Sequence, residues 1–375
     1  MNISQATLKN ADSGQSYRYE SLEHWRGIAA LAVVFRHGFY PMTVTDQVLH
    51  PVVRFFVFLS EYGGYGVIIF FVLSGYCISV KGVATLKKNE TARHFAVDRV
   101  LRIFPTYWAA CLFAILVAVM ASPFSAGKLV ASLPAGPLGL LGDVFLIHPY
   151  LNVPPVLGVS WTLVYEVGFY LMTAAGLSLA ARCKRLDLVV VAGGILAVVG
   201  VVGMGSFRVF YLLNHWPDFY CGLAVFLFVH FRLERPVFAA LSCVIPCALG
   251  ILAVSLHGWE GAASFLVAVV FSLVLMALKS FDRNVCAVRF LGPVALCGTF
   301  SYTLYLIHQP LTTRIVNGGL RFFRPDTLWA FAPVGVAVVV ALGASWIFYR
   351  QIELRVENWR RKWARQSACS RKQVN

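Results

Sequence analysis

Long apolar stretches separated by short polar loops are the feature that most limits how this chain can fold. A helix needs about 20 largely apolar residues to cross the hydrocarbon core of a bilayer. With 59% hydrophobic and 13% charged residues over 375 positions, and a mean hydropathy of +0.72, the chain is predicted to be an all-α integral membrane protein. The ten predicted spans cover residues 22–44, 58–80, 104–122, 158–180, 186–204, 214–231, 236–256, 260–279, 290–312 and 327–349.

The positions of the 32 lysine and arginine residues predict the orientation of these spans. With the N-terminus inside the cell, 24 of them fall on the cytoplasmic side, and Arg26 and Arg36 lie within the first span. The six on the outer side are Arg54, Lys128, Arg208, Arg314, Arg321 and Arg324. This asymmetry follows the positive-inside rule and places both termini in the cytoplasm. The net charge of +15 is therefore interpreted as topology and contact with anionic lipid, and no nucleic-acid partner is expected.

The chain is predicted to form one membrane domain over residues 21–351, with a cytoplasmic tail on each side. The N-terminal tail covers residues 1–20, and the basic C-terminal tail covers residues 352–375. Tryptophans interleaved with basic residues in the C-terminal tail favour an amphipathic helix at the membrane surface. No cleavable signal peptide and no metal site are expected, because neither a cleavage site nor a metal-ligand spacing is evident.

Two predicted loops stand out between the spans. The cytoplasmic loop 81–102 is basic, and the outer loop 123–157 is rich in proline and glycine. Within the outer loop, the apolar run from Leu138 to Ile147 is too short to cross a bilayer. This run is expected to lie in the interface or to re-enter the membrane.

Arg26 and His37 lie eleven residues apart in the first apolar stretch. Eleven helical residues bring two side chains to within roughly 20° of one face, with ~16 Å between them along the axis. Ionisable groups inside a membrane helix are costly and usually face a protein interior or a wet cavity. Each residue also has a structural interpretation, because Arg26 can reach the interface and His37 can be a core histidine bonded to its neighbours.

Short polar motifs interrupt five parts of the apolar sequence. They are Arg26-Gly27-Ile28 followed by His37, then Leu73-Ser74-Gly75-Tyr76, Arg99-Val100-Leu101-Arg102, Ser160-Trp161-Thr162-Leu163-Val164-Tyr165-Glu166, and Ser301-Tyr302-Thr303-Leu304-Tyr305-Leu306-Ile307-His308-Gln309-Pro310, with Glu353 after the last span. In this order the chain resembles the acyltransferase-3 family of multi-span membrane O-acyltransferases, from about Glu23 to Glu353. The resemblance implies transfer of acyl groups, often acetyl from acetyl-CoA, onto hydroxyls of cell-surface polysaccharides, glycolipids or secreted small molecules.

The resemblance carries specific roles over to four residues. Arg26 and His37 match the arginine–histidine pair considered essential in the family, and Arg99 and Arg102 match its paired arginines in a cytoplasmic loop. The chain departs from the family at Val167, where many members have a second acidic residue, and at Arg36, where an apolar residue is common. No hydrolase-like domain follows the membrane domain within this sequence.

The predicted topology arranges the polar residues in two layers. His37, Glu166 and His308 are expected in the outer half of the membrane, with His308 late in the ninth span. Arg26, Arg99, Arg102 and the Ser74-Gly75-Tyr76 turn are expected in an inner layer. The two layers suggest a polar shaft, because arginines suit phosphate groups inside and acid–base groups would lie deeper.

The donor is expected to enter this shaft from the cytoplasm. Arg99 and Arg102 are predicted to hold the nucleotide end of acetyl-CoA, whose extended pantetheine arm is of the same order as the ~16 Å between Arg26 and His37. A role of the two arginines as positive-inside anchors is left equally open. Ser74-Gly75-Tyr76 is predicted to border the donor as a helix break or a close backbone approach.

His37 is predicted to be the general base. A neutral imidazole with a pKa near the ordinary ~6.5 can take a proton from an acceptor hydroxyl. Glu166 is predicted to orient that imidazole, or alternatively to pair with Arg36 or Arg26 as a structural ion pair. His308 and Trp161 are predicted to contact the acceptor. A carbonyl-bonded histidine and an interfacial tryptophan are the structural alternatives.

Together these features predict a membrane O-acyltransferase of the bacterial inner membrane. Acetyl-CoA or another acyl-CoA would be its co-substrate, with no bound cofactor, and a carbohydrate or glycolipid its acceptor. Direct transfer in a ternary complex is favoured over an acyl-histidine. A proton-coupled transporter or exporter is the alternative, with the same ionisable residues forming a pathway. A non-catalytic membrane scaffold is the third class considered.

Overall fold

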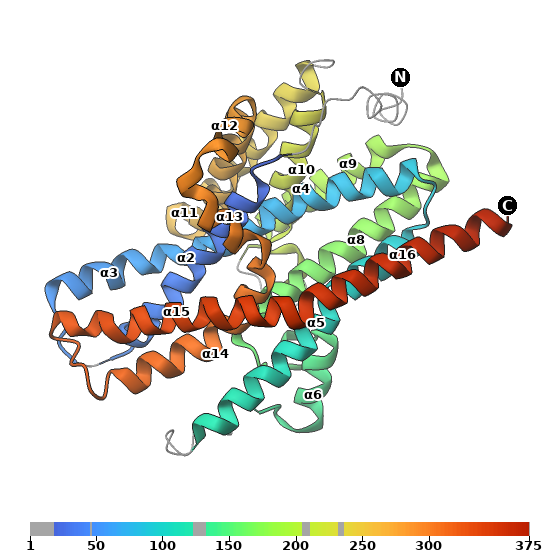
Figure 1. Ribbon diagram of the computed structural model, residues 1–375. Helices are drawn as coiled ribbons and strands as arrows, with labels where there is room; N and C mark the ends of the chain where they lie inside the picture. Colours follow the sequence, from blue (N-terminus) through green and yellow to red (C-terminus); the bar gives the residue numbers. More distant parts are fainter. Residues whose placement is uncertain (1–18, 46, 123–132, 205–210, 232–235, 375) are drawn as a thin grey trace. The chain divides into compact units, whose positions relative to one another are not determined.

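The structure is a computed structural model that describes residues 19–374 except 46, 123–132, 205–210 and 232–235 (Figure 1). Every regular element among these residues is a helix, which confirms the predicted all-α fold. The first 18 residues of the predicted N-terminal tail lie outside the described part of the chain. The same holds for Lys128, Arg208, Arg232 and Arg235, which were assigned to loops.

Six described helical stretches are long and apolar enough to cross a membrane, and a bent pair of helices makes a seventh. The six are Pro51–Lys87, Ala92–Ala121, Gly158–Cys183, Tyr211–His230, Pro236–Ala287 and Leu328–Gln366. Some large apolar side chains on these helices, such as Met120 and Ile251, are exposed, as expected for contact with lipid. The chain is therefore an integral membrane protein, and the count of ten spans and the cytoplasmic termini stay predictions.

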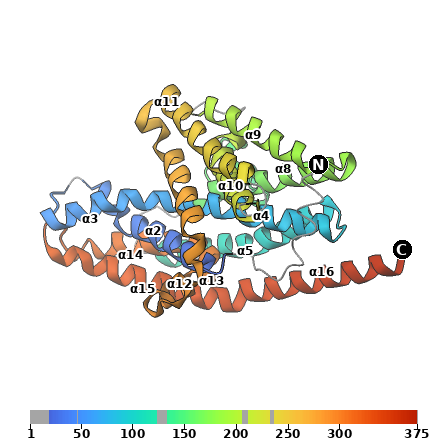
Figure 2. The same ribbon diagram turned by 90° about the horizontal axis from the view of Figure 1, so that it is seen from above.

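The remaining predicted spans are also helical. The first forms α2 (Leu22–Thr43), and the fifth forms α9 (Leu186–Val202), which has 17 residues. Spans seven and eight form α11 (Pro236–Leu278), which bends at Gly258, where φ is 70°. The Cys243 and Met276 sulfur atoms, 3.5 Å apart, show that the two arms of α11 lie side by side (Figure 2), so the chain turns back where the sequence predicted a loop.

The ninth predicted span is not one straight helix. α13 (Gly292–Thr299) and α14 (Ser301–Gly319) meet at an angle of 77°. His308 was expected late in that span, but it is the eighth of the 19 residues of α14. The prediction failed because an apolar count does not detect a bend at Phe300, after which a new helix begins.

The predicted cytoplasmic loop 81–102 is also wrong in its bounds. α4 runs over Gly66–Lys87 and α5 over Ala92–Ala121, so Arg99 and Arg102 lie on a helix and not in a loop. A helix of 30 residues is about 45 Å long and exceeds a hydrocarbon core of about 30 Å, so its first turns can carry charges. α4 is also continuous through Ser74-Gly75-Tyr76, so the expected helix break does not occur there.

The described chain divides into two compact units, each built from three separate segments. Unit 1 comprises Met1–Arg26, Val67–Val97 and Tyr165–Ala295, and unit 2 comprises Gly27–Gly66, Asp98–Val164 and Leu296–Asn375. The sequence predicted a single domain over 21–351, because its apolar stretches follow one another without a linker.

In unit 1, α4 and α10 (Trp216–Phe231) meet backbone to backbone. A Cβ atom on Gly75 would lie 2.1 Å from the Phe219 carbonyl oxygen, and one on Gly222 would lie 2.1 Å from the Val72 carbonyl oxygen. Only glycine allows helices to approach this closely, as is common in membranes. The predicted close backbone approach at Gly75 is therefore confirmed.

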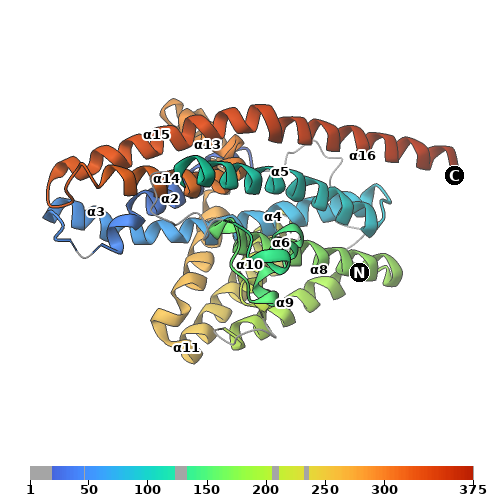
Figure 3. The ribbon, with the colours of Figure 1, turned by 90° about the horizontal axis from the view of Figure 1, so that it is seen from below.

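Unit 2 has a core between α2, α3 (Pro51–Glu61), α14 and α15 (Phe331–Phe348). Its buried members are Phe39, Met42, Val53, Val57, Val316, Ala330, Val334 and Ala337. A π-helical turn, Tyr349–Glu353, joins α15 to α16 (Leu354–Val374), and the two helices form one rod beside α5 (Figure 3). The predicted C-terminal tail is therefore a helix over its described residues.

The described part of the outer loop contains α6 (Gly136–Phe145), α7 (His148–Leu151) and η5 (Gly158–Ser160), followed by α8 (Trp161–Cys183). α6 holds most of the predicted apolar run, and its Leu138, Leu140 and Phe145 are exposed. A ten-residue helix with an exposed apolar face fits the predicted interfacial placement.

The remaining short elements are η2 (Tyr62–Tyr65), η6 (Tyr211–Leu213), η7 (Lys279–Phe281), α12 (Asp282–Ala287), η8 (Arg289–Leu291) and η9 (Leu328–Ala330).

Candidate functional site

Two histidines from distant parts of the sequence meet in unit 2. His308 on α14 is fully buried, and its Nε2 lies 3.2 Å from Nδ1 of His37 on α2. The Nδ1 atom of His308 lies 2.9 Å from the Leu304 carbonyl oxygen. His37 Nδ1 also lies 3.0 Å from the Val33 carbonyl oxygen. Each ring is therefore held by a carbonyl one helical turn earlier and by the other ring.

These contacts determine which nitrogen of each neutral ring carries the proton. His308 Nδ1 faces a carbonyl oxygen, which can only accept, so this atom is the donor and His308 Nε2 is left as an acceptor. His37 Nδ1 then donates, between Val33 and His308. The lone pair of His37 is consequently on Nε2, which bonds to no residue in the described part of the chain. A base needs such an open nitrogen.

The start of α8 is joined to α14 beside this pair. The Tyr305 hydroxyl donates to the Val159 carbonyl oxygen at 3.1 Å and accepts from the Thr162 hydroxyl at 2.9 Å. The Gln309 amide lies so close to Gly158 that a Cβ there would be 2.8 Å from its oxygen. The fourth and fifth sequence motifs thus meet around the histidines. Trp161 lies at the exposed start of α8, and its predicted contact with the acceptor stays a prediction.

The paired arginines, Arg99 and Arg102, lie on α5 of unit 2, apart from the histidine pair. Arg99 is buried and its Nη2 lies 2.7 Å from Oδ2 of Asp98. Close by, the Tyr302 hydroxyl donates to the Ile103 carbonyl oxygen at 2.9 Å, and Thr303 donates to Glu353. His308 follows Thr303 by five residues, which is about 7.5 Å along a helix. One unit therefore contains both the buried Arg99 and the histidine pair, with Thr303 and His308 about one and a half turns apart on α14.

The other predicted site residues belong to unit 1. Glu166 accepts hydrogen bonds from the Ser74 hydroxyl at 3.1 Å and from the Tyr170 hydroxyl. Arg26 has Glu23 as its carboxylate partner at 3.8 Å. Arg36, which was the other candidate partner of Glu166, belongs to unit 2 and donates to the carbonyl oxygen of Glu61 at 3.0 Å. The role of Glu166 in orienting His37 stays a prediction.

Gly75 and Tyr76 are enclosed by the packing of unit 1. Tyr76 is buried and its ring meets the Tyr19 ring edge to face, with centroids 5.3 Å apart. Gly75 lies at the crossing with α10 described above. Packing thus gives both residues a structural explanation, and their contact with the donor stays a prediction.

Sequence reasoning missed a histidine–aspartate pair in unit 1. Nδ1 of His215 lies 2.7 Å from Oδ2 of the buried Asp218, at the start of α10. The His215 ring also contacts Phe71 and Tyr165, with centroid distances of 5.0 and 4.7 Å. A histidine followed by an aspartate three residues later was the available signal, because these positions face each other on a helix.

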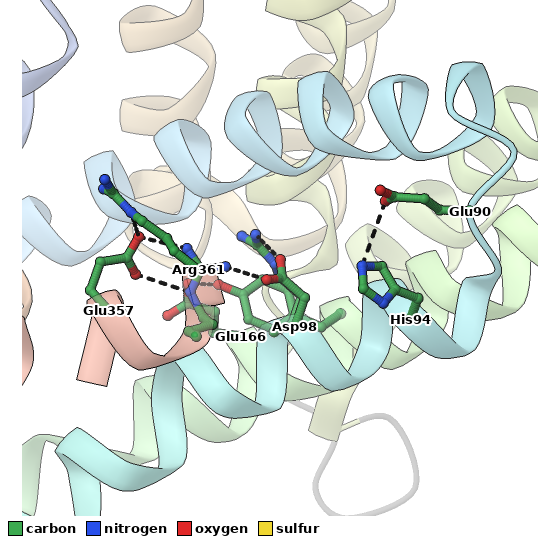
Figure 4. Close-up of polar contacts among 9 residues, drawn as sticks. Glu90, His94, Asp98, Glu166, Glu357 and Arg361 are labelled. Carbon is green, nitrogen blue, oxygen red and sulfur yellow. Dashed lines mark hydrogen bonds and ion pairs between the residues drawn. The ribbon is translucent and has the colours of Figure 1, made fainter. Parts of the chain in front are cut away.

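It also missed two acidic residues that contact arginines in unit 2. Asp98 contacts Arg99 and Arg360, and Glu357 contacts Arg360 and Arg361 (Figure 4). The spacing of Glu357, Arg360 and Arg361 on one helix was the available signal. The hydrogen bond from Arg360 on that helix to Asp98 could not be predicted from the spacing of residues in the sequence.

Two titratable residues are buried in the described outer segment. Burial raises the pKa of Asp143. Hydrogen bonds from the Val156 amide at 3.1 Å and from the Tyr107 hydroxyl lower it by a smaller amount. Burial lowers the pKa of His148 to about 4, with a smaller opposing effect of the nearby Gly142 carbonyl. Neither ring nitrogen of His148 has a hydrogen-bond partner among the described residues. The segment therefore favours the uncharged form of both residues.

No group of three or more histidine, cysteine or acidic residues that could hold a metal ion is found in the described ranges. A profile described as an acyltransferase domain matches residues 19–350, so the chain belongs to the acyltransferase-3 family.

Two characterised relatives resemble most of the chain. An exopolysaccharide production protein, ExoZ, of Rhizobium meliloti (strain 1021) is 28% identical over 295 residues, covering 74% of this chain and 86% of the relative. Nodulation protein 10 of Rhizobium leguminosarum bv. viciae is 24% identical over 361 residues, covering 88% of this chain and 92% of the relative. No solved structure matches the chain.

Proposed function

We propose that this protein is an O-acyltransferase that moves an acyl group, acetyl from cytosolic acetyl-CoA, onto a hydroxyl of a cell-surface or secreted carbohydrate or glycolipid. Membership of the acyltransferase-3 family supports acyl transfer. The names of the two relatives, one in exopolysaccharide production and one in nodulation, support a carbohydrate acceptor. A bacterial inner membrane is the location that suits a cytosolic donor and an exported acceptor.

The open Nε2 of His37 is the observation that carries the proposal. This atom accepts the proton of the acceptor hydroxyl while its ring is held through Nδ1 by Val33 and His308. The hydroxyl oxygen forms a bond to the acyl carbon, the carbon–sulfur bond breaks, and the thiolate leaves as CoA. The proton then passes from the imidazolium to the thiolate, so the histidine is regenerated. His308 orients the base in this scheme, a task that the sequence assigned to Glu166.

Arg99 and Arg102 bind the nucleotide end of the donor in the same proposal. Their i, i+3 spacing on α5 places both on one face of the helix, and guanidinium groups pair with phosphates in a bidentate manner. Arg26 is assigned to the same reaction through the family resemblance, and Ser74 and Glu166 through the polar layers predicted from the sequence.

The test is an assay of the purified full-length protein in lipid vesicles. Labelled acetyl-CoA and a surface-glycan extract are supplied, and release of free thiol is measured together with the mass of the glycan. We expect stoichiometric thiol release and a glycan heavier by one acetyl group. Uptake of unmodified substrate without thiol release would instead establish the transporter alternative.

A further inference from the structure

An apolar cleft of about 380 Å³ lies within unit 1, between α4, α8, α9 and α10. Its volume falls in the range of ~300–1,000 Å³ that is usual for small-molecule sites. Its lining residues carry no charge, and their polar side-chain groups are those of Ser79, Thr173 and Trp216. The Ser79 hydroxyl donates to the Gly75 carbonyl oxygen at 2.7 Å, and the Trp216 indole donates to that of Gly193 at 2.9 Å. The cleft therefore suits a hydrocarbon and not a polar molecule.

The cleft has a buried floor and an open side. Among its lining residues, Phe226 and Trp216 on α10 are buried, whereas Ala175 on α8 and Ala192 on α9 are exposed. Leu179, another lining residue of α8, is 44% exposed. The mouth of the cleft is therefore formed by α8 and α9. Because α8 belongs to a stretch that is long and apolar enough to cross a membrane, this mouth is accessible to the hydrocarbon chains of the bilayer.

The length of the cleft matches the depth of one lipid leaflet. Its lining residues run from Phe169 to Leu179 on α8 and from Leu186 to Leu196 on α9. Ten positions of a helix span about 15 Å, which is half of a hydrocarbon core of about 30 Å. Leu179 and Leu186 lie on the two sides of the turn that joins α8 to α9, so the cleft runs inward from this turn. A single acyl chain of one leaflet fits this length.

Arg182 places a positive charge at the end of the cleft next to that turn. It follows Leu179 by three residues, so the two side chains are neighbours on one face of α8. Side chains on a helix lean toward its N-terminus, so Arg182 covers the surface around Leu179. Arg182 is exposed and has no carboxylate partner among the described residues, whereas Arg185 at the same turn pairs with Asp187 at 2.6 Å. A guanidinium group at the end of a hydrocarbon cleft complements the phosphate of a lipid.

We propose that this cleft binds one acyl chain of an anionic glycerophospholipid, with the lipid phosphate on Arg182. The site is independent of the acyl transfer proposed for the chain. An anionic headgroup is favoured over a zwitterionic one because the turn carries three basic residues, Arg182, Lys184 and Arg185, and one acidic residue, Asp187. A lipid bound there fills the space between four helices and stabilises unit 1 by mass action.

The experiment is native mass spectrometry of the full-length protein in detergent, titrated with phosphatidylglycerol or with phosphatidylcholine of the same acyl chains. We expect the first phosphatidylglycerol to bind about fivefold more tightly than phosphatidylcholine, since one basic residue near a membrane surface contributes about that factor. Arg182→Gln should remove this preference. Arg289→Gln is the matched control, because it removes the same charge from another exposed position of unit 1 and should leave binding unchanged.

Ala192→Phe tests the hydrocarbon part of the site. The added ring fills the mouth of the cleft, so lysophosphatidylglycerol, which has a single acyl chain, should bind more weakly by about tenfold or more, the effect of excluding two methylene groups. Val191→Phe is the matched control, because it adds the same ring at the neighbouring exposed position, which does not line the cleft. Thermal unfolding shows whether Ala192→Phe is folded, and Arg182→Gln tests the site without a change in packing.

Three results would overturn the proposal. They are wild-type binding of lysophosphatidylglycerol by folded Ala192→Phe, equal affinities of the wild-type protein for the two headgroups, and tighter binding of a polyprenyl phosphate than of phosphatidylglycerol. The last result would identify a lipid carrier as the occupant of the cleft. None of the three bears on thiol release from acetyl-CoA, so the proposed function is tested separately.

Discussion

Each unit contains a histidine whose Nδ1 lies against a second titratable side chain, and the two pairs differ in which ring nitrogen has no partner among the described residues. In unit 2, His37 pairs with His308 and its Nε2 has no partner among the described residues. In unit 1, His215 pairs with the Asp218 carboxylate and its ring lies against Phe71 and Tyr165. The His215 pair more closely resembles a catalytic histidine–aspartate dyad, yet the family resemblance points to His37.

The comparison shows that a bonded imidazole can serve either stability or chemistry. A carboxylate buried at a helix start is costly unless it is paired, so we expect the contact with His215 to stabilise Asp218. His308 brings no carboxylate to its pair, and its Nε2 contact orients the His37 ring. The following predictions test whether the two pairs divide in this way.

The largest expected effect is that of His37→Gln on turnover. Loss of a general base should lower kcat by about 10²- to 10⁴-fold while the unfolding temperature stays the same. His215→Gln should keep kcat within about tenfold of the wild type. Both are measured as thiol release from acetyl-CoA. His230→Gln is the control, because His230 also bonds to a carbonyl four residues earlier, at 3.0 Å. The opposite ranking would assign the base to His215.

Asp218→Ala should act on stability more than on catalysis. Removing a buried carboxylate that bonds to a histidine should lower the free energy of unfolding by about 2–3 kcal/mol. Thermal unfolding of the detergent-solubilised protein measures this loss. The folded fraction should retain most of its kcat. A variant of normal stability with strongly reduced kcat would show that the unit 1 pair takes part in the reaction.

His308→Phe removes the acceptor that holds His37 Nδ1 and should lower kcat about tenfold, the effect of one lost hydrogen bond of about 1.4 kcal/mol. Val33 still holds the ring in this variant, so the loss should be smaller than in His37→Gln. His308→Gln can accept the same hydrogen bond through its amide oxygen and should recover part of the activity. Equal activity in the wild type, His308→Phe and His308→Gln would contradict the orienting role of His308.

His148 is a buried histidine whose ring nitrogens contact neither a second histidine nor a carboxylate among the described residues. Its folded pKa of about 4 lies below the unfolded value of ~6.5, so the unfolded chain binds more protons between these values and stability falls as pH falls. From pH 6.5 to 5.5 the loss should be about 1 kcal/mol. The measurement is the unfolding free energy against pH, compared with His148→Phe. An unchanged pH slope in the variant would exclude this contribution.

The helices were largely predictable, and the polar contacts were predictable only in part. Apolar runs identified every predicted span as helical because hydropathy and length are local properties. They misplaced the 81–102 loop, since charged residues extend α5 beyond its apolar part, and they missed the bend at Phe300. Residue spacing singled out Arg26 and His37, and the family resemblance singled out Arg99 and Arg102. The sequence predicted Glu166 as the neighbour of His37, and it did not reveal that His308 contacts this ring.

The sequence alone determined an all-helical membrane protein of the acyltransferase-3 family, because apolar stretches, basic residues and short motifs are read residue by residue. Only the tertiary structure decided that His308 holds His37, 271 positions away, and that Arg360 shares Asp98 with Arg99 across 262 positions. The physical reason is that such contacts depend on which helix faces pack together. Packing is a property of the whole assembly of helices, and no local spacing records it.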